Sequence, residues 1–165
     1  MNFIGISDEK LSKVVTKLNI LLASYSVYYQ NLRSFHWHIR GNNFFDIHRL
    51  FEELYNEAKV NIDDIAERIL TLNHKPLGSM ADYLKKSKIK ESVDMMQDEK
   101  MASIILKNHI KLITQIREVI EIASSVGDEG TVDILGGMLS KLEKYSWMLN
   151  SWKGRRKAGF RNSIK

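Results

Sequence analysis

The sequence predicts an all-α protein, a bundle of four long helices with a short extra helix in one long connection. Three observations favour this fold class. The 165 residues include only one Pro and nine Gly, so few residues interrupt a helix. Apolar residues recur at helical spacing over four long stretches. The connection between the second and third stretches is long and the other two are short, so the chain crosses the bundle once.

The first two helices form the predicted N-terminal hairpin. One is expected over residues 8–39, where apolar side chains recur every three or four positions. The other is expected over residues 43–72, which contain neither Pro nor Gly and are mostly good helix formers. Gly41 and Asn42 make a short break between them. A short loop makes the two helices antiparallel neighbours.

The long connection begins with residues 73–78, a segment that contains the one Pro and breaks the second helix. Ser79, with Asp82 three residues later, has the pattern of a helix N-cap. This pattern predicts a short helix that runs through about Lys86.

The third and fourth helices form the predicted second hairpin. Ser92 is a candidate N-cap for the third helix, which is expected to continue to about Ser125. Residues 127–130 contain two glycines and predict a turn. The fourth helix is then expected to start at Thr131 and to end near Trp152, so residues 1–152 form one domain and residues 153–165 a tail.

Five side chains that can bind metals lie on the first hairpin. His36 is near the end of the first helix, and His48 and Glu52 are one turn apart on the second. Asp63 and Glu67 form another one-turn pair further along it. Imidazoles with carboxylates suit iron, zinc or manganese, and the absence of thiolates argues against a structural zinc site.

Helix geometry divides these candidate ligands into two halves. Glu52 and Asp63 are eleven residues apart, close to three full turns, so both pairs lie on one stripe of the helix. They are nevertheless separated by about 16 Å along the axis, whereas metal–ligand bonds are about 2 Å long. Either the pairs are unrelated, or a second copy brings its Asp63 and Glu67 to the first half across a two-fold axis. A carboxylate pair alone is more often a solvated face, but the five together favour a site.

Two runs of the sequence resemble a known family. Residues 31–55, NLRSFHWHIRGNNFFDIHRLFEELY, and residues 63–70, DDIAERIL, resemble the Dps family, the mini-ferritins named as DNA-binding proteins from starved cells. The HW pair, the G-x-N-F-F segment, the second His and the D-x-x-A-E-R motif occur in register. The resemblance extends over nearly the whole chain. It implies a ferritin-like four-helix bundle that assembles as a hollow dodecamer.

The resemblance also implies an Fe(II)-oxidising site between two-fold-related subunits. His36, His48 and Glu52 would come from one subunit, and Asp63 and Glu67 from the partner. The family often has Asp where this chain has Glu52, so the coordination by this longer side chain departs from the pattern. Other ferritins build a di-iron site inside one bundle from Glu-x-x-His motifs. No His in this chain has an acidic residue three positions before it, which favours the intersubunit site.

The implied chemistry is Fe(II) oxidation, preferably by hydrogen peroxide and otherwise by O2, with ferric oxide stored in the cavity. Trp37, next to His36, is a candidate electron donor that traps radicals, although packing at an interface explains it equally well. Asp128 and Asp133 lie in a segment that resembles the family's acidic pores, where negative charge would attract entering iron. The alternative for both is a role at a turn or helix start.

The positive charge of the chain is concentrated at its C-terminus. The chain has 25 basic and 20 acidic residues, a net charge of +5, and without the tail this becomes 19 against 20. The tail is a candidate for non-specific binding of DNA phosphates that weakens steeply with salt, and Lys10, Lys13 and Lys17 are the alternative basic surface. A merely solubilising tail is the other reading. The six basic tail residues are Lys153, Arg155, Arg156, Lys157, Arg161 and Lys165.

The absence of cysteine and the hydropathy of the chain argue against disulfide-rich, secreted and membrane proteins. The chain has no Cys, so no disulfide framework is expected. Neither a signal peptide nor a membrane span is evident, which predicts a cytoplasmic protein, with nucleoid association left open. A dodecameric iron-storage ferroxidase is the favoured function. The alternatives are a DNA-compaction protein with little iron chemistry and a non-cage metalloprotein that uses manganese or zinc at the same ligands.

Overall fold

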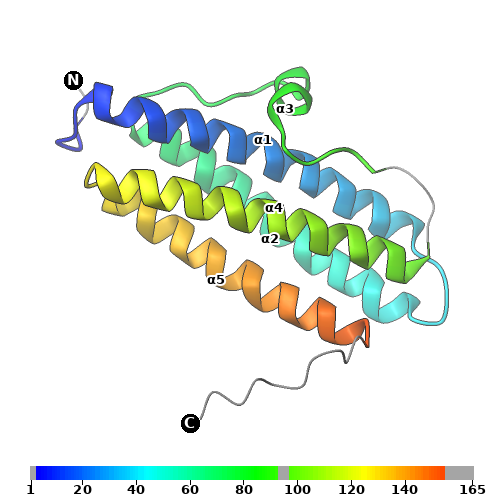
Figure 1. Cartoon of the computed structure of the whole chain (residues 1–165). Coiled ribbons are helices and arrows are strands. Elements are labelled where there is room, and N and C mark those ends of the chain that lie inside the picture. The colour runs from blue at the N-terminus through cyan, green and yellow to red at the C-terminus, as the bar shows by residue number, and fades with distance from the viewer. Residues whose placement is uncertain (1–2, 93–96, 155–165) are drawn as a thin grey trace, which may run out of the picture.

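The computed structural model describes residues 3–92 and 97–154, and these residues form a bundle of long α-helices. The helices are α1 (Asp8–His38), α2 (Phe44–Thr71), α3 (Met80–Lys86), α4 (Asp98–Ser125) and α5 (Glu129–Trp152). Figure 1 shows α1 and α2 as one antiparallel hairpin and α4 and α5 as another. The connection that carries α3 runs along α1 from one end of the bundle to the other. The predicted all-α fold with one long crossover is confirmed.

α1 is the central helix of the core. It packs against α2, α4 and α3, whereas α5 packs mainly against α4. Its inward face is mostly apolar, and Leu11, Leu18 and Leu32 on it are fully buried. Each such side chain contributes about 2 kcal/mol through its removal from water. This burial fixes which faces of α1 and α2 remain outside the core.

The loop between α1 and α2 and the start of α3 follow the predicted signals. Gly41 has a φ of 121°, which other residues rarely adopt, so the chain can reverse within a few residues. Ser79 caps α3, and its hydroxyl oxygen accepts a hydrogen bond from the backbone N–H of Asp82 at 3.1 Å. The N-cap predicted at Ser79 is confirmed.

The predicted start of the third long helix at Ser92 is wrong, because α4 begins at Asp98. The backbone N–H of Ser92 donates to Asn31 Oδ1 of α1 at 2.8 Å. Asn31 Nδ2 in turn donates to the carbonyl oxygen of Lys90 at 2.9 Å. Asn31 is buried, so this pair of hydrogen bonds holds the connection against α1 and keeps Ser92 out of a helix.

The predicted start of the last helix at Thr131 is also wrong, because α5 begins at Glu129. Asp128 is the N-cap, and its Oδ1 accepts a hydrogen bond from the backbone N–H of Thr131 at 3.1 Å. The cap draws Gly130 into the first turn, so the predicted turn is shorter than expected. The predicted end at Trp152 is confirmed. In the part of the chain that the structure describes, no helix is long and apolar enough to cross a membrane.

Candidate metal site

Two of the candidate ligands meet where α1 ends and α2 begins. The imidazole rings of His36 and His48 stack with their centroids 3.7 Å apart and an interplanar angle of 21°. Both side chains are partly buried. The short loop between the helices produces this meeting, because it sets the last turn of α1 against the first turns of α2.

Reciprocal hydrogen bonds fix the orientation of both rings. His36 Nδ1 donates to the backbone carbonyl of His48 at 2.9 Å, and His48 Nδ1 donates to the backbone carbonyl of His36 at 2.9 Å. A carbonyl can only accept, so each Nδ1 carries a proton. In a neutral ring this leaves the Nε2 lone pair of each His available to bind a metal.

One of these two hydrogen bonds also satisfies a backbone carbonyl at the end of α1. The carbonyl of His36 lies in the last turn of α1, where carbonyl groups lack a partner within the helix. His48 supplies that partner from α2. The two histidines therefore join the end of α1 to the start of α2. The same hydrogen bonds leave the Nε2 atom of each ring without a partner in them.

Aromatic side chains flank the pair on both sides. The ring of Phe44 stacks on His48 with centroids 4.8 Å apart. The ring of Tyr55 makes an edge contact with His36, with centroids 5.4 Å apart at 84°. These contacts limit the movement of both imidazoles.

Glu52 is connected to this group through Tyr55. The Tyr55 hydroxyl donates to Glu52 Oε1 at 3.3 Å. Desolvation by surrounding side chains, and then the Glu52 carboxylate, raise the pKa of the Tyr55 phenol, so the hydroxyl stays protonated at neutral pH. Glu52 is itself exposed on α2, one turn from His48. The first half of the predicted ligand set thus lies in one region.

Asp63 and Glu67 lie apart from this half. Both side chains are exposed further along α2, and Glu67 borders a shallow hollow with Arg68 and Thr71. Among the described residues of one chain, no three His, Asp or Glu side chains are placed to hold one metal ion. A single chain therefore brings together His36 and His48, with Glu52 beside them, but not the second half of the set.

Trp37 projects from the same end of α1. Its side chain is 57% exposed, and the guanidinium of Arg33 lies 4.8 Å from the ring centroid. Arg33 also lies over the Tyr29 ring at 5.3 Å. The electron-donor role of Trp37 stays a prediction.

The two predicted pore residues have different surroundings. The Asp128 carboxylate is buried, forms an ion pair with Arg68 and accepts hydrogen bonds from Thr131. A buried carboxylate that is paired with a cation attracts ions from solvent weakly, so these contacts favour a structural role for Asp128, and its pore role stays a prediction. Asp133 is exposed on α5 and stays a pore candidate.

The predicted DNA-binding tail is only partly described. Lys153 directly follows α5, and its ammonium donates to Ser103 Oγ of α4. This residue is therefore held against the bundle. Arg155, Arg156, Lys157, Arg161 and Lys165 lie outside the described residues.

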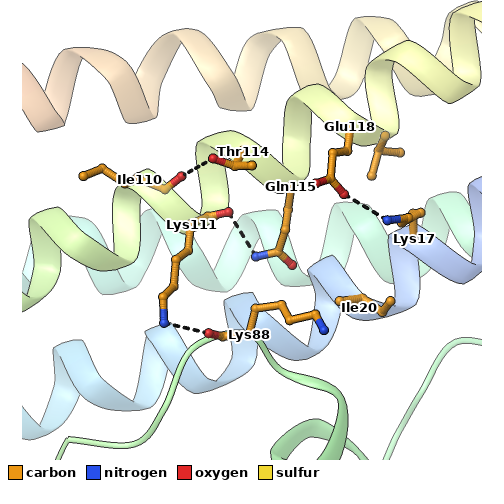
Figure 2. A pocket seen from close by; sticks show the side chains of 9 residues that line it. Lys17, Ile20, Lys88, Ile110, Lys111, Thr114, Gln115 and Glu118 are labelled. Carbon is orange, nitrogen blue, oxygen red and sulfur yellow. Dashed lines mark hydrogen bonds and ion pairs between the residues drawn. The ribbon is translucent and has the colours of Figure 1, made fainter.

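One lysine of the alternative basic surface lies in a groove between α1 and α4, which Figure 2 shows. The groove has a volume of about 430 Å³ and lies away from the histidine pair. Lys17 forms an ion pair with Glu118 across it at 2.9 Å. Lys111 donates to the backbone carbonyl of Lys88 at 2.9 Å and ties the crossover to α4. Two lysines of the groove, Lys17 and Lys111, are therefore already paired with groups of the same chain.

Sequence reasoning did not single out Tyr55, which contacts two of the candidate ligands. Tyr55 lies three residues after Glu52, and side chains at this spacing are neighbours on a helix surface. That spacing was the available signal. Its contact with His36 depends on the packing of the hairpin and has no local signature.

Comparison with known proteins agrees with this architecture. A family model described as a ferritin-like domain matches residues 15–157. The chain is 39% identical to DNA protection during starvation protein 2 of Bacillus anthracis, over 85% of this chain and 96% of that protein. It is 40% identical to a DNA protection during starvation protein of Porphyromonas gingivalis, over 90% of this chain and 93% of that protein.

A solved structure gives the same result. The crystal structure of a Dps protein from Vibrio cholerae matches with a TM-score of 0.89 and 39% identity, over 92% of this chain and 96% of that chain. That protein is described as a member of a broad superfamily of ferritin-like diiron-carboxylate proteins.

Proposed function

Because the chain belongs to the Dps family of ferritin-like proteins, we propose that it oxidises Fe(II) at sites shared between two subunits. Iron is the substrate, and hydrogen peroxide is the preferred oxidant. The ferric product is stored as an oxide inside a dodecameric cage. Its curated relatives from B. anthracis and P. gingivalis are named for DNA protection, and removal of Fe(II) and peroxide would protect DNA from oxidative damage.

The observation that supports this proposal most directly is the locked histidine pair. His36 and His48 each use Nδ1 on a backbone carbonyl, which leaves Nε2 for a metal. Imidazole nitrogen and carboxylate oxygen are suitable ligands for Fe(II), and Glu52 stands one turn from His48. One subunit supplies this half, and the partner subunit's Asp63 and Glu67 complete it.

Exposed apolar side chains on α2 and α3 support contact between subunits near the helix that carries Asp63. Val60 of α2 is 53% exposed, and Met80 and Leu84 of α3 are 77% and 51% exposed. With Ile62 of α2, Met80 and Leu84 also line a groove of about 520 Å³ beside α1. Clustered apolar side chains on a surface mark sites of protein association. A partner that covers this groove would lie beside α2, the helix that carries four of the candidate ligands.

The residues would favour oxidation through their charge. Carboxylates interact more strongly with Fe(III) than with Fe(II), because the product has the higher charge. Peroxide accepts two electrons, one from each of two Fe(II) ions, and takes up protons to form water. The overall reaction therefore releases no hydroxyl radical.

The first test removes the two imidazoles. In the double variant His36→Ala/His48→Ala, peroxide-dependent Fe(II) oxidation should slow by about tenfold or more, because changes at or around metal ligands have effects of this size. His38→Ala is the matched control, since His38 is exposed and its Nδ1 donates to the carbonyl of Ser34. Stopped-flow absorbance measures the rate on protein of verified assembled mass. Wild-type rates in the double variant would show that these histidines do not form the site.

DNA contact is a separate part of the proposal. Its support is the concentration of basic residues after α5, together with the names of the relatives. The competing function, DNA compaction with little iron chemistry, depends on the same residues. The two functions are separable, because the tail is not part of the ligand set.

A further inference from the structure

We propose that Tyr55 is a positioning residue that holds Glu52 and His36 in the half-site of one subunit before the partner subunit and the metal arrive. The inference rests on the proposed function and extends it to a residue outside the ligand set. Its basis is that one side chain contacts two candidate ligands, one on each helix of the hairpin.

The first contact restrains the carboxylate. Glu52 is exposed on α2, and a free Glu side chain samples many rotamers. The Tyr55 hydroxyl donates to its Oε1 at 3.3 Å across one turn of the helix. This bond favours rotamers in which Glu52 stays on the face that carries His48.

The second contact restrains the imidazole. The Tyr55 ring meets His36 edge-on, with centroids 5.4 Å apart at 84°, and His48 stacks on His36. His36 is therefore held between Tyr55 and His48. His36 Nδ1 also donates to the backbone carbonyl of His48. Rotation of the His36 ring would therefore break this hydrogen bond and the contacts with both neighbouring rings.

Tyr55 is itself supported by α1. The Tyr29 ring packs against it at 6.1 Å and 84°, and the guanidinium of Arg33 lies over Tyr29. Tyr55 is thus part of a layer that spans both helices and ends at the two candidate ligands. Because these side chains are already ordered, metal binding would cost less of their conformational entropy.

The test uses Co(II), whose visible spectrum reports its ligands, on the full-length assembled protein. Tyr55→Phe keeps the ring and removes the hydroxyl, so Co(II) affinity should fall roughly tenfold and the spectrum should change. Tyr29→Phe is the matched control and should bind Co(II) like the wild type. With Fe(II), Tyr55→Phe should raise KM more than it lowers kcat.

A double-mutant cycle separates positioning from a general structural effect. Glu52→Asp shortens the carboxylate by one methylene and takes it away from the Tyr55 hydroxyl, so adding Tyr55→Phe should then have little further effect. Equal effects of Tyr55→Phe in both backgrounds, or wild-type Co(II) binding in Tyr55→Phe, would overturn the inference. His36→Ala/His48→Ala separates this failure from that of the proposed function. If that variant loses Co(II) and Tyr55→Phe does not, only the role of Tyr55 is rejected.

Discussion

The hydrogen bonds of individual histidines in this chain divide them into two kinds. His36 and His48 leave Nε2 unused, as metal ligands require. In His109, which is fully buried, both ring nitrogens are engaged. Its Nδ1 donates to Ser146 Oγ at 2.8 Å, because the Ser146 hydroxyl itself donates to the carbonyl of Leu142. Its Nε2 accepts from the Tyr28 hydroxyl at 2.7 Å, so His109 links α1, α4 and α5 as a core residue.

Burial of His109 predicts a loss of stability in acid. Desolvation lowers the pKa of His109 from 6.5 to about 3. Below pH 6.5 His109 binds a proton in the unfolded chain but not in the folded chain. The contribution of His109 to the free energy of unfolding therefore falls as the pH drops from 6.5 towards 3. Between pH 7 and pH 5 the loss from this group should be about 2 kcal/mol.

Urea unfolding at several pH values, at one protein concentration, measures this slope. His109→Gln retains a donor and an acceptor but cannot gain the proton, so its stability should depend less on pH. His38→Gln, a change at an exposed histidine, should keep the wild-type slope. An unchanged slope in His109→Gln would contradict the assignment.

Residue chemistry was predictable only in part. The identity of the two histidines at one end of the hairpin followed from helix lengths and a short loop. Which ring nitrogen is free did not follow, because it depends on a carbonyl that the other helix presents. The burial of Asp128 could not be predicted from the sequence either, because its partner Arg68 lies sixty residues earlier in the chain.

At the scale of elements, one buried carboxylate takes part in joining the end of α2 to the start of α5. Asp128 caps α5 and forms an ion pair with Arg68, which directly follows Glu67 on α2. A Cβ added at Gly130 would lie 2.9 Å from Arg68 Nη2, so the guanidinium would have to shift if a larger residue replaced this glycine. The network therefore fixes the end of α2 that carries Asp63 and Glu67.

Asp128 and Asp133 should respond differently to substitution. Asp128→Ala removes the cap and leaves a mostly buried Arg68 unpaired, which should lower the free energy of unfolding by about 3 kcal/mol. Asp133→Asn should change it by less than about 0.5 kcal/mol, as is usual for exposed sites. If Asp133 lines a pore, its variant should instead slow iron uptake. Urea unfolding together with iron-uptake rates measures both effects, and a stable Asp128→Ala would contradict the structural role.

The elements themselves were predictable where local signals decide them. The ends of α1 and α2 and the cap at Ser79 depend on breakers and short-range hydrogen bonds. The start of α4 was not predictable, because buried Asn31 holds Ser92 through tertiary contacts. Sequence patterns fail where a side chain from another helix competes for the backbone.

At the scale of the whole molecule, the proposed site is one that a single chain leaves incomplete. The histidine half lies where α1 meets α2, and the carboxylate half lies on α2 about 16 Å further along the axis. Val60 of α2 and Met80 and Leu84 of α3 are exposed apolar side chains, and they are part of the surface that we propose for a second copy. Helix spacing predicted this division from the sequence, whereas the identity of the contact surface required knowing which faces the core leaves uncovered.

Subunit mixing tests the shared site most directly. One chain carries His36→Ala/His48→Ala and the other carries Asp63→Ala/Glu67→Ala, so neither alone should oxidise Fe(II) rapidly. In randomly mixed oligomers half of the two-fold pairs combine both chains, and each such pair rebuilds one of its two sites. Activity should therefore return to about one quarter of the wild-type value. No recovery in oligomers verified by mass to contain both chains would contradict a site shared between subunits.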